Sequence, residues 1–86
     1  MLPFKEKKIE DYFIREFSFH TNSNEFVWHR DREDRIISAI NENDWKFQFD
    51  NQLPIDINEK EIFIPKNTFH RIIKGSGNLK IKLKKL

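Results

Sequence analysis

The 86-residue sequence contains no cysteine, only two glycines and three prolines, and no apolar run long enough to cross a bilayer. The absence of cysteine excludes a disulfide framework, a zinc ribbon, an iron–sulfur cluster and a thiol nucleophile. A membrane-spanning helix needs about 20 apolar residues, and residues 1–8 lack the apolar segment and cleavage site of a signal peptide. We therefore expect a soluble, cytoplasmic protein without a membrane partner.

The sequence also lacks a strong excess of charge of either sign. Sixteen Lys and Arg residues face 14 Asp and Glu residues, so the net charge is only +2. That value is too small to indicate nucleic-acid binding by itself. Basic residues gather at the end of the chain, in Lys80–Lys85, where they alternate with apolar ones. We interpret this segment as an edge strand kept soluble by its lysines, and we do not expect nucleic acid as a partner.

Aromatic residues and period-two alternation are what the sequence has in quantity. Nine Phe and two Trp residues suffice for one compact core in a chain of this length. Apolar and polar residues alternate in short segments that are separated by turns rich in Asn, Asp and Pro, which is typical of antiparallel strands. The expected strands cover residues 12–20, 25–31, 35–40, 45–49, 53–57, 61–64, 69–73 and 79–84.

This pattern predicts an all-β sandwich or barrel that forms a single domain over residues 1–86. Residues 1–10 are expected to be an N-terminal arm, either a short helix or irregular, and residues 11–86 to be the barrel. Trp45, Phe47 and Phe49 share one face of their segment and are expected in the core. Phe26 and Trp28 are expected to point outward, so that a homodimer would cover them.

Two histidines and one carboxylate are the residues with the clearest chemical potential. His29 and Asp31 lie two residues apart in an expected strand, on the face that also carries Val27. His70 shares a face with Ile72 and can also point inward. Buried polar groups of this kind need one another, water or a metal as partners. Two His and one carboxylate suit a non-haem iron(II) site, or zinc with a bound water.

The segment before His70 resembles the second sequence motif of the cupin superfamily. That motif reads Gly, five residues, Pro-x-Gly, two residues, His, three residues, Asn. In this chain Pro65 falls on the proline and His70 on the histidine. Asn67 replaces the second glycine, Glu59 replaces the first, and Lys74 replaces the final Asn.

The segment that begins at His29 resembles the first cupin motif in a degenerate form. That motif reads Gly, five residues, His-x-His, three or four residues, Glu, six residues, Gly. His29 falls on the first histidine, whereas Asp31 takes the place of the second and Arg35 the place of the glutamate. Glu42 stands at the closing glycine. Neither motif needs a gap for this alignment.

The resemblance implies a double-stranded β-helix, the jelly-roll barrel of cupins, with a divalent metal held inside by His29, Asp31 and His70. It leaves the metal open among Fe, Ni, Mn and Zn. It further implies frequent homodimers and a small polar or anionic ligand in the barrel mouth. It fixes no reaction, so the protein can be an enzyme or not. The alternative is a metal-free cupin that binds a small molecule or serves as a dimerising structural module.

Arg35 is a departure from the family pattern that admits two roles. Because arginine stays protonated, it cannot ligate a metal. It can pair with Asp31 and Asp34 and close the site, or it can bind an anionic substrate beside the metal. In the second case Asp34 would lie behind the ligands and hold Arg35 or a metal-bound water.

The scarcity of glycine bears on the turns of such a barrel. Glu42, Glu59 and Asn67 stand where cupins usually have glycine. Asparagine adopts the left-handed conformation at modest cost, so Asn67 is expected to do so. Glu42 and Glu59 must either avoid a positive φ or tolerate strain.

Overall fold

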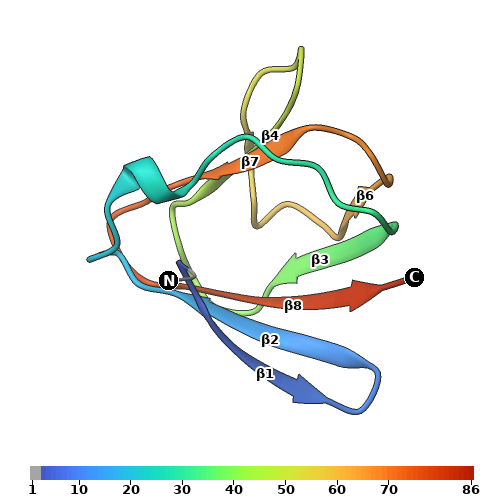
Figure 1. The fold of residues 1–86 in the computed structure, drawn as a ribbon. Helices are drawn as coiled ribbons and strands as arrows, with labels where there is room; N and C mark the ends of the chain where they lie inside the picture. Colours follow the sequence, from blue (N-terminus) through green and yellow to red (C-terminus); the bar gives the residue numbers. More distant parts are fainter. Residues whose placement is uncertain (1–2) are drawn as a thin grey trace.

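A computed structural model of the chain describes residues 3–86, and in it the chain is almost entirely β-structure (Figure 1). The elements are β1 (Lys5–Ile9), β2 (Tyr12–Phe17), the 3-10 helix η1 (Ser23–Glu25), β3 (Arg35–Ala39), β4 (Lys46–Phe49), β5 (Ile55–Asp56), β6 (Ile62–Ile64), β7 (His70–Ile73) and β8 (Leu79–Lys85). No helix in the described residues is long and apolar enough to span a membrane.

The strands form two antiparallel sheets. The larger has the order β1-β2-β8-β3-β6, and the smaller has the order β5-β4-β7. Their inner faces meet in one core, which contains Phe17, Ile37, Trp45, Phe47, Ile57, Ile62, Ile64, Leu79, Ile81 and Leu83. Trp45 and Phe47 are at most 1% exposed, and Phe49 packs against this core. The expected all-β jelly-roll barrel and its aromatic core are therefore confirmed.

Three strand assignments differ from the prediction, at the N-terminus, at β8 and at residues 25–31. Lys5–Ile9 is not a helix or an irregular arm but a strand, β1, which pairs along its whole length with β2. β8 is not an edge strand, because it lies between β2 and β3 in the middle of the larger sheet. The predicted alternation of β8 is confirmed, since Leu79, Ile81 and Leu83 are buried while the lysines face outward. Alternation reports which face is buried and not which strands are neighbours.

The expected strand at residues 25–31 is absent from the structure. Asn22 accepts a hydrogen bond from the Asn24 N–H through its side chain, which starts η1 instead. After η1 the chain runs as an irregular segment to β3, with one bridge between His29 and His70. It crosses between the two sheets, because the carbonyls of Asp31 and Asp34 accept hydrogen bonds from the N–H groups of Asn67 and Leu86.

Because residues 26–34 do not alternate as a strand does, three expected orientations change. Val27 was expected inside but is 59% exposed. Phe26 was expected outside, yet its ring contacts that of Trp45 edge-on at 5.3 Å and packs against the core. Trp28 does point outward, at 40% exposure, with the Arg71 guanidinium over its ring.

The turns are built without left-handed glycine. Neither glycine has a positive φ, and the positive values belong to Glu10, Asn51 and Asn67. Asn67 thus takes the left-handed conformation that was expected from its motif position. Among the described residues Glu42 and Glu59 avoid positive φ, so neither stores the strain that the prediction allowed.

Candidate functional site

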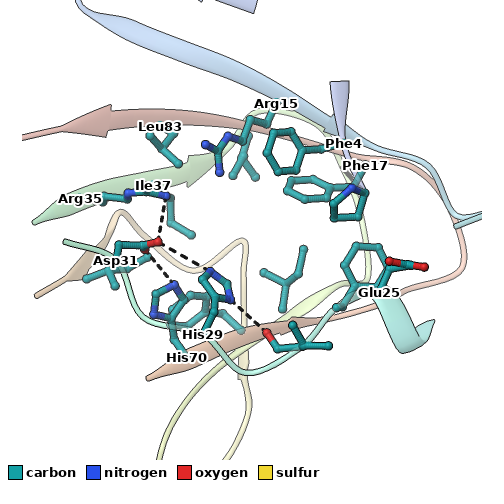
Figure 2. Close-up of a pocket in the computed structure, with 17 residues that line it drawn as sticks. Phe4, Arg15, Phe17, Glu25, His29, Asp31, Arg35, Ile37, His70 and Leu83 are labelled. Carbon is teal, nitrogen blue, oxygen red and sulfur yellow. Dashed lines mark hydrogen bonds and ion pairs between the residues drawn. The ribbon is translucent and has the colours of Figure 1, made fainter. Parts of the chain in front are cut away.

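His29, Asp31 and His70 come together where the irregular segment passes over β7 (Figure 2). One ligand atom from each lies within 4.8 Å of the others. His29 Nε2 is 4.0 Å from Asp31 Oδ1, and His70 Nε2 is 3.3 Å from Asp31 Oδ2. The three residues that sequence parity and motif position selected are therefore neighbours in space, although two of them are not in a strand.

The backbone bridge between the two histidines explains this convergence. His29 and His70 exchange both N–H···O=C bonds, at 3.0 and 2.9 Å, so their side chains lie side by side. The ring centroids are 4.3 Å apart. His70 is further fixed by Phe47, whose ring stacks on the imidazole at 5.6 Å. The site thus depends on a single bridge that joins the irregular segment to the smaller sheet.

Both imidazoles are held in the same tautomer. Nδ1 of His29 is 3.0 Å from the Val27 carbonyl oxygen, and Nδ1 of His70 is 2.8 Å from that of Thr68. A carbonyl oxygen only accepts hydrogen bonds, so each Nδ1 must carry the hydrogen and donate it. In a neutral imidazole, Nε2 then carries a lone pair. Two such nitrogens face the carboxylate of Asp31, which also offers only lone pairs.

Asp31 Oδ2 is the buried polar atom that most needs a partner. No hydrogen bond reaches it from the described residues, and its side chain is only 10% exposed. An unpartnered buried carboxylate oxygen is costly. Burial lowers the pKa of the His70 imidazole, and the neighbouring His29 and Arg35 add to that shift, whereas the hydrogen bond to Thr68 and the charge of Asp31 oppose it. When His70 is neutral, its Nε2 cannot donate, so this nitrogen and Asp31 Oδ2 face each other at 3.3 Å as two acceptors.

Arg35 closes one side of this group. Its Nη1 lies 3.4 Å from Asp31 Oδ1, while its Nε and Nη2 donate to Glu33 Oε1 at 2.9 and 2.7 Å. The hydrogen bond from Arg35 holds the pKa of the Glu33 carboxyl below its usual range. Sequence reasoning missed Glu33, because the charged run Arg30–Arg35 offers several acidic partners and spacing alone does not choose among them.

Asp34 lies in a different place from the one expected. Its carboxylate accepts a hydrogen bond from the Lys66 backbone N–H at 2.7 Å, and its carbonyl accepts one from Leu86. It therefore ties the irregular segment to the turn after β6, and Glu33 takes the place beside Arg35 that was expected of Asp34. A role for Asp34 toward a bound water stays a prediction, as does substrate binding by Arg35.

The three side chains line one end of a cavity of about 290 Å³ inside the barrel. Figure 2 shows Phe4 and Phe17 on the side of this cavity away from Asp31 and Arg35. The sequence pattern did not predict this aromatic wall, because Phe4 lies in the expected arm and Phe26 was expected to point outward. The sequence shows that both residues are aromatic. That their rings border the same cavity depends on the paths of β1 and residues 26–34, which the sequence pattern does not give.

Comparison with solved structures identifies the architecture. A cupin-2 domain protein from Shewanella frigidimarina superposes with a TM-score of 0.61 at 19% identity, over 93% of this chain and 76% of that one. A mannose-6-phosphate isomerase-like protein from Ralstonia eutropha gives 0.69 at 11% identity, over 95% and 81%. The chain has the cupin fold.

A third match is the crystal structure of FeII HppE. Its TM-score is 0.63 at 10% identity, and the match covers 87% of this chain but only 41% of HppE. At these identities the likeness establishes the fold alone. No model of a protein family and no curated protein sequence matches the chain.

Proposed function

We propose that this cupin-fold protein binds one divalent metal ion through His29 Nε2, an Asp31 carboxylate oxygen and His70 Nε2. The observation that carries the proposal is the shared tautomer, which turns two nitrogen lone pairs toward an acidic side chain that has no hydrogen-bond donor for Oδ2. A bound metal would supply a Lewis acid or an oxygen-activating centre. Because His29, Asp31 and His70 also line the cavity, a small molecule in the cavity would lie beside the bound ion.

The present distances are compatible with this role. Metal–ligand bonds of about 2.0–2.2 Å place adjacent ligands roughly 3 Å apart, and His70 and Asp31 are already 3.3 Å apart. The side chain of His29 is 50% exposed, so it has room to approach. We propose further that Arg35 acts as a positioning residue that holds Asp31, since its guanidinium is shared between Asp31 and Glu33.

Metal binding by single-histidine variants tests the proposal. Wild-type protein is titrated in turn with Zn²⁺, Fe²⁺, Mn²⁺ and Ni²⁺, and bound ions are counted per chain. We expect one ion, and we expect His29→Ala and His70→Ala each to weaken binding by at least about a hundredfold, because even residues that only orient ligands are worth about 10- to 100-fold. His29 is half exposed, so its variant tests the site without emptying the core.

His20→Ala is the matched control. His20 is the third histidine of the chain, it is exposed beside Phe19, and it does not line the cavity. Its loss should leave the binding unchanged. A wild-type protein that binds none of the four ions would overturn the proposal in favour of a metal-free module, in which Arg35 alone compensates the charge of Asp31.

A further inference from the structure

The wall of the cavity adds an apolar requirement to the small polar or anionic ligand expected from the sequence. Apart from the charged group at one end, its lining is dominated by Phe, Ile and Leu side chains from both sheets. Among residues 3–86, no Ser, Thr, Asn, Gln or Tyr side chain lines it. A ligand with several hydroxyl groups would therefore bury them without partners along this wall.

The charged side chains at the cavity are largely committed to one another. Arg15 is paired with Glu6, and its guanidinium also lies 4.2 Å from the centre of the Phe4 ring. Arg35 is held by Asp31 and Glu33. Glu25 is exposed. Two places can therefore serve the polar group of a ligand, the guanidinium of Arg15 and the end formed by His29, Asp31 and His70. Arg15 lies against the Phe4 ring, whereas the other end lies across the cavity from the rings of Phe4 and Phe17.

The opposite end offers an aromatic surface. Phe17 contacts Phe4 and Phe26 with ring centroids 5.4 and 6.1 Å apart, and all three rings border the cavity. Such rings bind a flat or branched apolar group well. The volume of about 290 Å³ lies at the lower end of the range of about 300–1,000 Å³ for small-molecule sites, so the ligand is small.

We infer that the cavity takes a small amphipathic molecule, one aromatic or branched aliphatic group that carries a single carboxylate or similar oxygen group. The apolar body would lie against Phe4, Phe17 and Phe26, and the oxygen group would reach the end formed by His29, Asp31 and His70. This inference rests on the proposed metal site for its polar anchor. It places sugars and sugar phosphates outside the ligand class, although one fold match is a mannose-6-phosphate isomerase-like protein.

Three probes separate the possibilities. Benzoate carries the ring and the carboxylate, acetate carries the carboxylate alone, and mannose 6-phosphate represents polyhydroxylated anions. Each is titrated by calorimetry into metal-free and Zn²⁺-loaded protein. Because burying a ring removes apolar area from water, we expect benzoate to bind the loaded protein at least about tenfold more tightly than acetate and mannose 6-phosphate. Equal or tighter binding of mannose 6-phosphate would overturn the inference.

Variants locate the binding. Phe26→Ala should weaken benzoate binding and leave the affinity for Zn²⁺ within twofold, since Phe26 borders the cavity but is not one of the three proposed metal ligands. Phe63→Ala is the matched control, because Phe63 is 49% exposed and does not line the cavity. Should Phe26→Ala fold poorly, the comparison of the three probes on wild-type protein decides the question alone.

The two proposals fail differently. Zn²⁺ binding without any preference for benzoate over acetate overturns the ligand class and leaves the metal site standing. Absence of Zn²⁺ binding overturns the metal site, and the metal-free titration then shows whether the aromatic wall binds benzoate unaided. Benzoate binding that is unchanged in Phe26→Ala but lost in Phe63→Ala would place the probe on the outer surface and contradict the inference.

Discussion

At the scale of single residues, the chemistry of this protein depends on which hydrogen bonds each polar side chain already makes and which of its atoms have no partner. Each histidine donates a hydrogen bond from Nδ1 to the backbone carbonyl oxygen two residues earlier, His29 to Val27 and His70 to Thr68. That local geometry fixes the tautomer before any ligand arrives. Asp31 is then surrounded by two nitrogen lone pairs and one guanidinium, so its charge is only partly compensated.

Arg35 supplies the first test at this scale. Its side chain is 12% exposed and Asp31 is 10% exposed, so Arg35→Gln leaves a buried carboxylate with too little compensation. We expect a loss of about 3 kcal/mol in the free energy of unfolding, the order found when one partner of a buried ion pair is removed. Saturating Zn²⁺ should restore part of that loss by compensating Asp31. Urea unfolding with and without Zn²⁺ measures both effects.

Arg32→Gln is the control for this variant, because Arg32 belongs to the same charged run but is exposed. It should change the stability by no more than about 0.5 kcal/mol. If Arg35→Gln were as stable as wild type and instead lost benzoate binding, the positioning role would be wrong. Arg35 would then be the ligand-binding residue that the sequence also allowed.

At the scale of elements, the sequence predicts the strand that carries His70, observed as β7, but not the irregular segment that carries His29 and Asp31. The spacing His29-x-Asp31 and the position of His70 five residues after Pro65 were sufficient to assign the three residues to one site. The strand expected at residues 25–31 is irregular because Asn22 starts a 3-10 turn and the carbonyls of Asp31 and Asp34 bond to a turn and to the chain end. The contact made by Asn22 is local, but the two carbonyl contacts are long-range, and periodicity does not report them.

The same limit explains the position of β8. Its lysines and apolar residues alternate as an exposed edge strand would, and only the pairing with β2 and β3 distinguishes the two cases. The charged ammonium groups are accommodated on the outer face, where Lys82 lies 4.5 Å from the Tyr12 ring centre. The burial of the apolar face of β8 was predictable from the sequence, but the number of strands that pair with β8 was not.

The loop before β8 contains both glycines and tests a packing requirement. A Cβ on Gly75 would collide with the Asp44 carboxylate and would lie 2.7 Å from the Trp45 ring. Neither group moves easily, since Ser76 donates two hydrogen bonds to Asp44, and the indole N–H of Trp45 donates to the Gly77 carbonyl. We expect Gly75→Ala to lower the free energy of unfolding by about 1–3 kcal/mol.

Gly77→Ala is the matched control, since a Cβ there meets no atom within 4 Å. Its effect should stay within about 0.5 kcal/mol. Thermal or urea unfolding of the two variants, side by side, checks the difference. Equal stabilities would mean that the contact between this loop and Trp45 is less constrained than the structure indicates.

At the scale of the whole molecule, two sheets enclose an apolar cavity with one polar end. The barrel and its core were predictable because alternation and the spacing of turns are local signals. The cavity was not, because its aromatic wall combines Phe4 from before β1, Phe17 from β2 and Phe26 from the irregular segment. Phe26 was expected on the outer surface because side chains would alternate between two faces in a strand at residues 25–31, and that strand is absent.

The homodimer expected from the sequence stays a prediction. Trp28 and Phe63 are 40% and 49% exposed and remain available to a second copy of the chain, whereas Phe26 belongs to the core. Sedimentation of the purified protein would measure the association. The metal site does not require it, because all three proposed ligands come from one chain.

The measurement that tests the central claim most directly is nitrogen NMR of the protein with ¹⁵N-labelled histidine, recorded before and after addition of Zn²⁺. The account predicts that His29 and His70 carry their hydrogen on Nδ1 in both states, and that Zn²⁺ shifts the Nε2 resonances of these two residues while those of His20 stay unchanged. Hydrogen on Nε2 of His70 in the metal-free protein, or a Zn²⁺ shift confined to His20, would contradict it.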